Sequence, residues 1–253
     1  MGDINVALHQ GQKRMLKSLC VIPARCGSKG LKDKNILDLC GKPVIAYTIE
    51  VCLKSNLFDN VYIATDSKKY AEIAKKYGAQ APFLEPEEMA GDSISSIEPV
   101  IWYYEKLKSK YDLLWCFQPT SPLKKVADLI NAYKLLENDT NCEFVLSTTI
   151  IDPHYFHWAL YDKDDGYSEL YFGKKNLVDR NLLKPTAYRP NGAIKVGRTE
   201  SVLKWRHFFG DNIKRVEMPE ERSIHIRTQS DLDLCEFLIS KKGILKLAQK
   251  EKK

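Results

Sequence analysis

Several patterns that define common functional classes are missing from this sequence of 253 residues. Its seven cysteines form no CxxC pair, the spacing that zinc sites and thioredoxin-like redox sites use. No apolar run approaches the roughly 18 residues of a membrane-spanning helix, and the first 15 residues lack the apolar core of a secretory signal peptide. Because the cysteines are odd in number and scattered, we expect reduced thiols in a cytoplasmic protein and no zinc site. Because long apolar runs are missing, we expect a soluble protein with no membrane partner.

The positive charge is modest, because the formal net charge is +6 and the charged residues, 28% of the total, are spread along the chain. We find no basic patch interleaved with aromatic residues, no nucleic-acid-binding motif and no internal repeat, so we expect no nucleic-acid partner. Small anionic ligands explain the excess of lysine and arginine as well as nucleic acid does. The length favours one α/β domain that carries an insertion.

The most informative stretch is SLCVIPARCGSKGLKDKN, residues 18–35. An apolar run is followed at once by a loop with Gly27 and Gly30, which allow a positive φ and let backbone N–H groups approach a ligand. Four side chains supply positive charge: Arg25, Lys29, Lys32 and Lys34. The spacing matches neither a Walker A loop nor GxGxxG. It favours a buried strand that ends at a phosphate site, and a solvated basic turn is the alternative.

Apolar periodicity alternates between strand-like and helix-like segments along the rest of the chain. We expect strands at residues 19–22, 60–65, 81–84, 113–118, 144–150, 191–196, 213–217 and 223–226. We expect helices at about 44–52, 67–78, 92–108, 126–137 and 230–249. This alternation predicts an α/β fold with a doubly wound, mostly parallel sheet, and such sheets bind ligands at the carboxyl ends of their strands.

Two segments depart from this alternation. Residues 1–17 are expected to form a flexible N-terminal extension, and residues 18–253 form the remaining domain. Within that domain, residues 152–190 contain aromatic residues and DKDDG and GKK turns but no clear period. We expect this excursion from the sheet to act as a dimerisation arm or a lid.

Six strings spread between residues 19 and 239 carry a resemblance to one family: PARCGSKGLKDKN, IATDS, EPEEMAGDSISS, FQPTSPL, YRPNGAIKV and ERSIHIRTQSDL. Together they resemble the acylneuraminate cytidylyltransferases, which activate sialic acids and related acids with CTP. The resemblance implies a Rossmann-like nucleotidyltransferase fold, CTP and a small anionic acceptor as substrates, and Mg²⁺ as cofactor. It also implies a homodimer formed through the excursion.

The resemblance assigns one set of residues to the nucleotide. The matching positions are Ala24, Arg25, Gly27, Ser28, Lys29, Gly30, Lys34, Asn35 and Ser96. The family chemistry is an in-line attack of an acceptor oxygen on the α-phosphorus of CTP, with pyrophosphate leaving. We expect Lys34 or Lys29 to contact the α-phosphate and Arg25 to bind the leaving phosphates, which makes these three the candidate catalytic residues.

A second set of matches lies on the acceptor side. It comprises Gln118, Arg189, Asn191, Phe208 and Phe209. For the two phenylalanines, core packing is the alternative to lining a pocket. For Arg189 the alternative is a surface ion pair.

Departures from the family pattern concentrate near the expected acceptor. Relatives carry an Asp-Ile-Asp string that helps to hold magnesium, whereas this chain has SIHIR at residues 223–227. On the nucleotide side, Glu85 replaces an arginine of the family. Magnesium prefers oxygen ligands and arginine has no lone pair to offer, so the metal ligands are unknown, with Asp66 and Asp92 as candidate replacements.

Three basic or ionisable side chains, Lys195, His225 and Arg227, make the expected acceptor side cationic. A phosphate suits such a pocket better than a single carboxylate does. We therefore predict a phosphorylated small-molecule acceptor and a CDP-linked product, similar to the divergent branch that cytidylylates compounds such as phosphoglutamine in capsule decoration. Pairing of Arg227 with Asp231 or Glu217 is another explanation of these charges.

Two other functions stay open at this point. One is a synthetase of CMP-linked nonulosonic acids of the sialic, legionaminic or pseudaminic type, in which a metal would ease deprotonation of the attacking hydroxyl. The other, from a different class, is a noncatalytic nucleotide-binding regulatory paralogue. Pyrophosphate release from CTP separates the enzymes from the binding protein.

Overall fold

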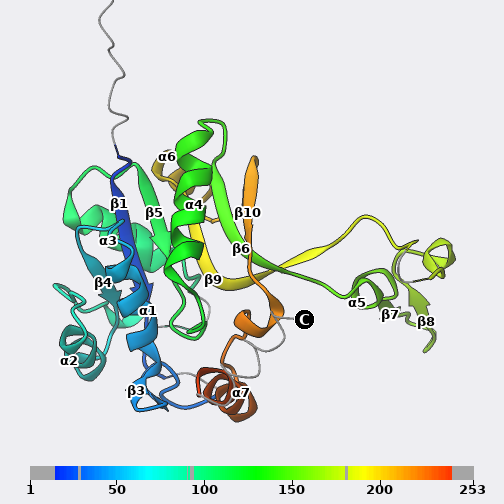
Figure 1. The fold of residues 1–253 in the computed structure, drawn as a ribbon, viewed down its shortest axis with the longest axis horizontal. Coiled ribbons are helices and arrows are strands. Elements are labelled where there is room, and N and C mark those ends of the chain that lie inside the picture. The colour runs from blue at the N-terminus through cyan, green and yellow to red at the C-terminus, as the bar shows by residue number, and fades with distance from the viewer. Residues whose placement is uncertain (1–14, 28–29, 90, 92–93, 180–181, 241–253) are drawn as a thin grey trace, which may run out of the picture.

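The computed structural model describes residues 15–27, 30–89, 91, 94–179 and 182–240, and a six-stranded sheet lies at its centre (Figure 1). The strand order is β10-β6-β9-β5-β1-β4. The strands are β1 (Ser18–Pro23), β4 (Val61–Ala64), β5 (Leu113–Cys116), β6 (Phe144–Ile150), β9 (Tyr188–Arg198) and β10 (Ile213–Glu217). Strand β1 is parallel to both β4 and β5, β10 is parallel to β6, and β9 runs antiparallel between β5 and β6. The predicted α/β, mostly parallel sheet is confirmed, with β9 as its antiparallel member.

Helices cover both faces of this sheet, as Figure 1 shows. They are α1 (Val44–Lys54), α2 (Lys68–Lys76), α3 (Glu98–Leu107), α4 (Val126–Asn138) and α6 (Thr199–Trp205). Helix α7 (Gln229–Ile239) packs in a separate apolar cluster with Leu39 and Val44. Side chains of β1 alternate between two core layers: Cys20 and Ile22 pack with residues of α1 and α4, whereas Leu19 and Val21 pack with residues of α3 and α6. Because both faces are buried, these strands are continuous apolar runs in the sequence.

The helix boundaries follow local capping chemistry. Helix α2 begins where the Ser67 hydroxyl accepts a hydrogen bond from the Tyr70 N–H, and Gly78 adopts a φ of 92° just beyond its end. Helix α3 begins at Glu98, with Pro99 in its first turn, instead of near the predicted residue 92. Ile94 and Ser95 have no regular structure and Ser96 and Ile97 form a turn, so these residues lie in a loop before α3.

The excursion occupies residues 151–187, between β6 and β9, and projects away from the sheet in Figure 1. It contains helix α5 (Pro153–His157), a hairpin of β7 (Leu160–Asp162) and β8 (Ser168–Leu170), and a 3₁₀ turn η2 (Lys174–Asn176). Smaller elements elsewhere are β2 (Asp38–Leu39), β3 (Lys42–Pro43), η1 (Glu87–Met89) and η4 (Glu220–Arg222). Within the described part of the chain, no helix combines the length and apolar character needed to cross a membrane.

Two predicted strands are wrong. Residues 81–84 form no ladder, and only the adjacent Gln80 makes an isolated bridge, with Tyr62. Residues 223–226 run extended beside the loop after β5, where the Ile226 N–H donates to the Thr120 carbonyl over 2.7 Å. The cause is that Ile226 anchors a separate apolar cluster with Leu232 of α7, which draws this segment away from the sheet edge.

Candidate functional site

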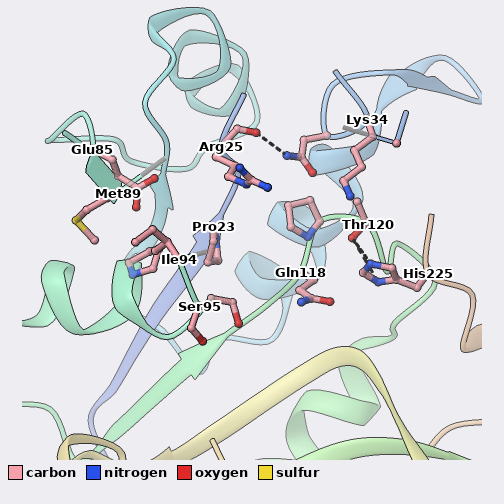
Figure 2. Close-up of a pocket in the computed structure, with 15 residues that line it drawn as sticks. Pro23, Arg25, Lys34, Glu85, Met89, Ile94, Ser95, Gln118, Thr120 and His225 are labelled. Carbon is pink, nitrogen blue, oxygen red and sulfur yellow. Dashed lines mark hydrogen bonds between the residues drawn. The ribbon is translucent and has the colours of Figure 1, made fainter. Parts of the chain in front are cut away.

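A cavity of about 370 Å³ opens at the carboxyl ends of β1 and β5 (Figure 2). Pro23 ends β1, and Gln118 follows β5 at its floor. This is the position that a doubly wound sheet offers to a ligand. Its volume lies in the range of small-molecule sites, from about 300 to 1,000 Å³.

One wall of this cavity is basic and comes from the loop after β1. Arg25 and Lys34 line it together with Asn35, whose side-chain amide donates to the Arg25 carbonyl over 3.2 Å. Burial, with the neighbouring Arg25 and Arg227 cations, lowers the pKa of Lys34. Several cations therefore converge on a space that an anion would fill favourably.

The remaining residues predicted for this loop have different places. Gly30 lines the cavity, and a Cβ there would lie 3.0 Å from the Arg227 carbonyl oxygen, so the loop packs closely against residue 227. Ala24 is fully buried and donates its N–H to the Ala64 carbonyl, and Gly27 adopts a φ of 78°. These two shape the loop without lining the cavity. The predicted Ser28 and Lys29 lie outside the described residues.

The opposite wall is mostly apolar. Met89, Ile94 and Pro99 line it, and Ser96 lies at its edge. Glu85 is the carboxylate among the cavity-lining residues, and its side chain is on the same side as Met89 and Ile94 in Figure 2. Sequence reasoning treated position 85 only as a departure from a family pattern, because a glutamate in EPEEMA gives no sign that it will be buried.

A neutral histidine closes the other end of the cavity. His225 Nδ1 lies 3.1 Å from the Ser121 hydroxyl, and its Nε2 lies 3.3 Å from the Thr120 hydroxyl. Burial, with the nearby Lys34 and Arg227 cations, lowers the pKa of His225 to about 4. The imidazole is therefore uncharged at neutral pH and serves as a hydrogen-bonding group.

Lys124 holds the turn next to this histidine, and the sequence analysis did not identify it as a site residue. Its ammonium group donates to the Thr48 hydroxyl over 2.7 Å and to the carbonyls of Ser121 and Gln118 over 2.7 and 3.3 Å. Burial lowers its pKa to about 8. Lys124 thus fixes the turn whose hydroxyls hold His225, a role that requires knowledge of the tertiary structure.

A second cavity of about 310 Å³ adjoins the first, and Gln118 and His225 line both. Arg189, Lys195 and Arg227 bring three cations to it, and its described lining contains no carboxylate. Lys195 also links the two cavities, because its ammonium group donates to the Ser96 hydroxyl over 3.1 Å. The structure thus brings most of the residues predicted for the acceptor together in the second cavity, beside the first.

The side chain of Gln118 depends on a glycine to lie between the two cavities. Gly192 has a φ of 76°, and a Cβ at this position would overlap the Gln118 side-chain oxygen. Only glycine accepts both this backbone conformation and this close approach. This packing explains the glycine of the YRPNGAIKV string.

Two predicted acceptor residues have mainly structural contacts. The Asn191 amide is buried, donates to the Ser223 hydroxyl over 2.9 Å and accepts from the Ser147 hydroxyl over 2.5 Å. Phe208 is buried in the core layer that contains α3 and α6, as the packing alternative anticipated, and is absent from both cavity linings. Phe209 is 40% exposed and lines the second cavity.

The alternative ion pairs of Arg227 do not account for the cationic cavity. Glu217 pairs with Arg215 over 2.9 Å. Asp231 caps α7 by accepting from the backbone N–H groups of Arg227 and Thr228. The Arg227 guanidinium is near enough to contribute to the lowered pKa of Asp231, yet it still lines the second cavity.

The described residues offer no site that would hold a magnesium ion by protein side chains alone. They contain no group of three or more His, Cys, Asp or Glu side chains that could bind a metal. Of the two candidate replacements, Asp66 already accepts from the Cys26 N–H over 2.8 Å and from its thiol over 2.9 Å, and Asp92 lies outside the described residues.

Comparison with known proteins gives the family. The family model described as cytidylyltransferase matches residues 19–172. The N-acylneuraminate cytidylyltransferase of Escherichia coli O18:K1:H7 (strain RS218) is 37% identical over 232 residues, which are 91% of this chain and 54% of that protein. The pseudaminic acid cytidylyltransferase of Campylobacter jejuni strain 81-176 is 33% identical over 228 residues, 88% of this chain and 96% of the relative.

The fold is also similar to that of a synthetase of known structure. The solved structure of a CMP:2-keto-3-deoxy-manno-octonic acid synthetase in complex with CTP aligns with a TM-score of 0.67 over 92% of this chain and 99% of that chain, at 19% identity. At this identity the likeness bears on the fold alone, whereas the family model and the two relatives match the sequence itself. The chain therefore belongs to the cytidylyltransferase family, in its acylneuraminate cytidylyltransferase-like group.

Proposed function

We propose that this protein transfers CMP from CTP to a phosphate oxygen of a small phosphorylated acceptor and releases pyrophosphate. The observation that carries the proposal is the second cavity, which holds Arg189, Lys195 and Arg227 and no carboxylate in its described lining. A phosphate with two negative charges matches three cations better than a single carboxylate does. The cavity adjoins the nucleotide side through Gln118 and His225, so an acceptor bound there lies beside the triphosphate.

The chemistry needs little beyond positioning and charge. An acceptor phosphate oxygen attacks the α-phosphorus in line, the bond from that phosphorus to the bridging oxygen breaks, and pyrophosphate takes the electron pair. Arg25 and Lys34 line the wall where the triphosphate would lie, and they would stabilise the charge on the phosphoryl oxygens and on the leaving group. Lys29 remains a predicted contributor from the same loop.

A phosphate acceptor also needs no general base. A phosphate oxygen is already ionised at neutral pH and needs no deprotonation, whereas a sugar hydroxyl does. His225 is neutral and lies within hydrogen-bond distance of the Ser121 and Thr120 hydroxyls, which hold the imidazole in place between the two cavities. In this proposal Mg²⁺ would be bound by the triphosphate of CTP. We also propose that the CDP-linked product is used in capsule decoration.

The second candidate function is a CMP-nonulosonic acid synthetase. It is favoured by the identity of 33% to 37% with relatives named for pseudaminic and N-acylneuraminic acid. In this reaction an anomeric hydroxyl attacks, and the product carries one phosphorus between cytidine and the sugar. The same cationic cavity would then bind the carboxylate of the acid.

Phosphorus-31 NMR of the product separates the two reactions. A phosphate acceptor gives a diphosphate linkage, whose two phosphorus atoms appear as a pair of coupled doublets. A sugar acid gives a single uncoupled phosphodiester resonance. We expect the coupled doublets when the enzyme is supplied with CTP, Mg²⁺ and small phosphorylated metabolites, and a product with only the single resonance from nonulosonic acids would contradict the proposal.

We further propose that the chain forms a homodimer through the excursion. Apolar side chains on this segment are exposed, including Tyr155, Leu160 and Leu177. Such a concentration on a projecting segment is typical of an interaction surface. A second copy of the chain is the partner that the family resemblance implies.

A further inference from the structure

Glu85 has an unusual position for a carboxylate in a protein that handles a triphosphate. It lies between α2 and η1, its N–H donates to the carbonyl of Thr65 at the end of β4 over 2.9 Å, and its side chain lines the first cavity while the residue is only 6% exposed. Its Oε1 atom is buried and has no hydrogen-bond partner among the described residues. A buried carboxyl oxygen without a partner is costly, which indicates that a ligand supplies the missing donor.

The polarity of the cavity orients the nucleotide. Arg25 and Lys34 mark the end that attracts phosphates, whereas Met89 and Ile94 lie with Glu85 at the apolar end (Figure 2). A carboxylate repels phosphate groups, but a flat, apolar base with a polar edge fits between apolar side chains and one hydrogen-bonding group. Glu85 is therefore placed to meet the base, and Arg25 and Lys34 to meet the triphosphate.

We propose that the Glu85 carboxylate selects the base by accepting a hydrogen bond from the 4-amino group of cytosine. This inference rests on the proposed use of CTP. In uracil the amino group is replaced by a carbonyl oxygen, which is an acceptor like the carboxylate, so the two would repel. A site built around a polar group discriminates strongly against an analogue that leaves this group unpaired.

An amide at the same position would lose this selectivity. A glutamine side chain presents both an N–H donor and a carbonyl acceptor and can rotate by half a turn. It can therefore pair with the N3 and N4 positions of cytosine or with the N3 and O4 positions of uracil. Glu85→Gln is thus expected to accept both bases, whereas the loss of a merely structural glutamate would weaken both equally.

The environment of Glu85 makes this selection dependent on pH. Burial, together with the neighbouring Asp66, raises the pKa of Glu85 to about 7. The other groups that bear on it are the Tyr103 hydroxyl of α3, which donates to two backbone carbonyls, and Arg25, which lines the same cavity. Above pH 7 the carboxylate only accepts. Below pH 7 the protonated carboxyl also donates and can pair with uracil, so selectivity falls as the pH falls through 7.

The experiment measures dissociation constants by calorimetry for CTP, UTP and the triphosphate of pyrimidin-2-one riboside, which is CTP without its amino group. At pH 8 the native protein is expected to bind CTP about tenfold or more tightly than either analogue, and this ratio should shrink at pH 6. In Glu85→Gln the ratio of CTP to UTP should approach one at both values of pH. The Glu85→Ala variant should bind CTP and the triphosphate of pyrimidin-2-one riboside with the same dissociation constant.

Glu88→Gln is the matched control, because Glu88 lies three positions away, is exposed and does not line the cavity. It should keep the native ratio and its pH dependence, and thermal unfolding should show that all variants fold. If CTP binds but Glu85→Gln keeps the native ratio, the role of Glu85 is refuted while the proposed function stands. If the folded native protein binds no CTP, both are refuted.

Discussion

Lys34 illustrates at the residue scale how the cations of the site oppose one another in the nucleotide-free protein. Its pKa is lowered by burial and by Arg25 and Arg227, which means that the surrounding protein disfavours its charge. A bound triphosphate reverses this balance. Residues that bind ligands in this way are expected to reduce the stability of the empty protein.

The variant Lys34→Met tests this balance. We expect the melting temperature of the nucleotide-free protein to rise by about 2 °C, because a partly buried, repelled charge is removed. The stabilisation by CTP should largely disappear, and kcat/KM should fall about 100-fold or more. Differential scanning fluorimetry with and without CTP measures the first two effects. Lys69→Met, at an exposed position of α2, is the control and should change none of them.

The lowered pKa of His225 should make the stability of the fold sensitive to acid. Its pKa is about 4 in the folded protein, below the value of about 6.5 in an unfolded chain, so the unfolded state takes up a proton first as the pH falls. The stability contributed by the neutral imidazole is complete above about pH 6.5 and is lost progressively toward pH 4. In His225→Gln the melting temperature should depend less steeply on pH across this window. A slope identical to that of the native protein would contradict the assignment, and the exposed His207→Gln serves as a control.

At the element scale, Asn191 connects segments that are distant in the sequence. From β9 its side chain bonds Ser147 of β6 and Ser223 of the segment that leads to His225. The Asn191 carbonyl also accepts from the Ser121 hydroxyl over 3.3 Å. This network sets the position of the second cavity relative to the sheet.

Asn191→Ala should therefore destabilise the fold. We expect a loss of about 1 to 3 kcal/mol in the free energy of unfolding, because the buried hydroxyls at residues 147 and 223 each lose one of their hydrogen-bond partners. Urea denaturation measures this value, with the exposed Asn131→Ala on α4 as the control. A loss as small as that of the control would show that the network does not stabilise the fold.

The sequence predicted those elements whose signals are local. The β1 strand, helix α2 and the apolar strands β5 and β6 follow from apolar periodicity. The antiparallel direction of β9 and the extended path of residues 223–226 depend on which neighbours they meet, and a periodic pattern does not encode this. Glu85 and Lys124 were missed as site residues for the same reason, since their burial is a tertiary property.

At the scale of the whole molecule, the excursion is the segment with the least evident role within one chain. Its hairpin and helix are held by aromatic contacts such as Phe156 with Phe172 and Tyr161 with Tyr171, so it forms a defined arm with apolar side chains outward. Covering these side chains by a second copy would remove apolar surface from water.

A charge placed on this arm should separate the protomers. We expect the native protein to have the mass of a dimer in light scattering coupled to size exclusion, and Leu160→Glu with Leu177→Glu to shift it to a monomer. Both leucines are more than half exposed, at 64% and 55%, so the fold should tolerate the change. The control Leu234→Glu, at an exposed position of α7, should stay dimeric. A monomeric native protein at micromolar concentration would refute the dimer.

The molecule as a whole offers two adjoining cavities, one suited to a nucleoside triphosphate and one lined by Arg189, Lys195 and Arg227. The most direct test of this arrangement is pyrophosphate release from CTP with Mg²⁺, measured with a pool of small phosphorylated metabolites and with a pool of nonulosonic acids. We predict release with the phosphorylated pool alone. Release with the nonulosonic acids alone would contradict the phosphate acceptor, and no release with either pool would contradict the proposal that this protein is an active cytidylyltransferase.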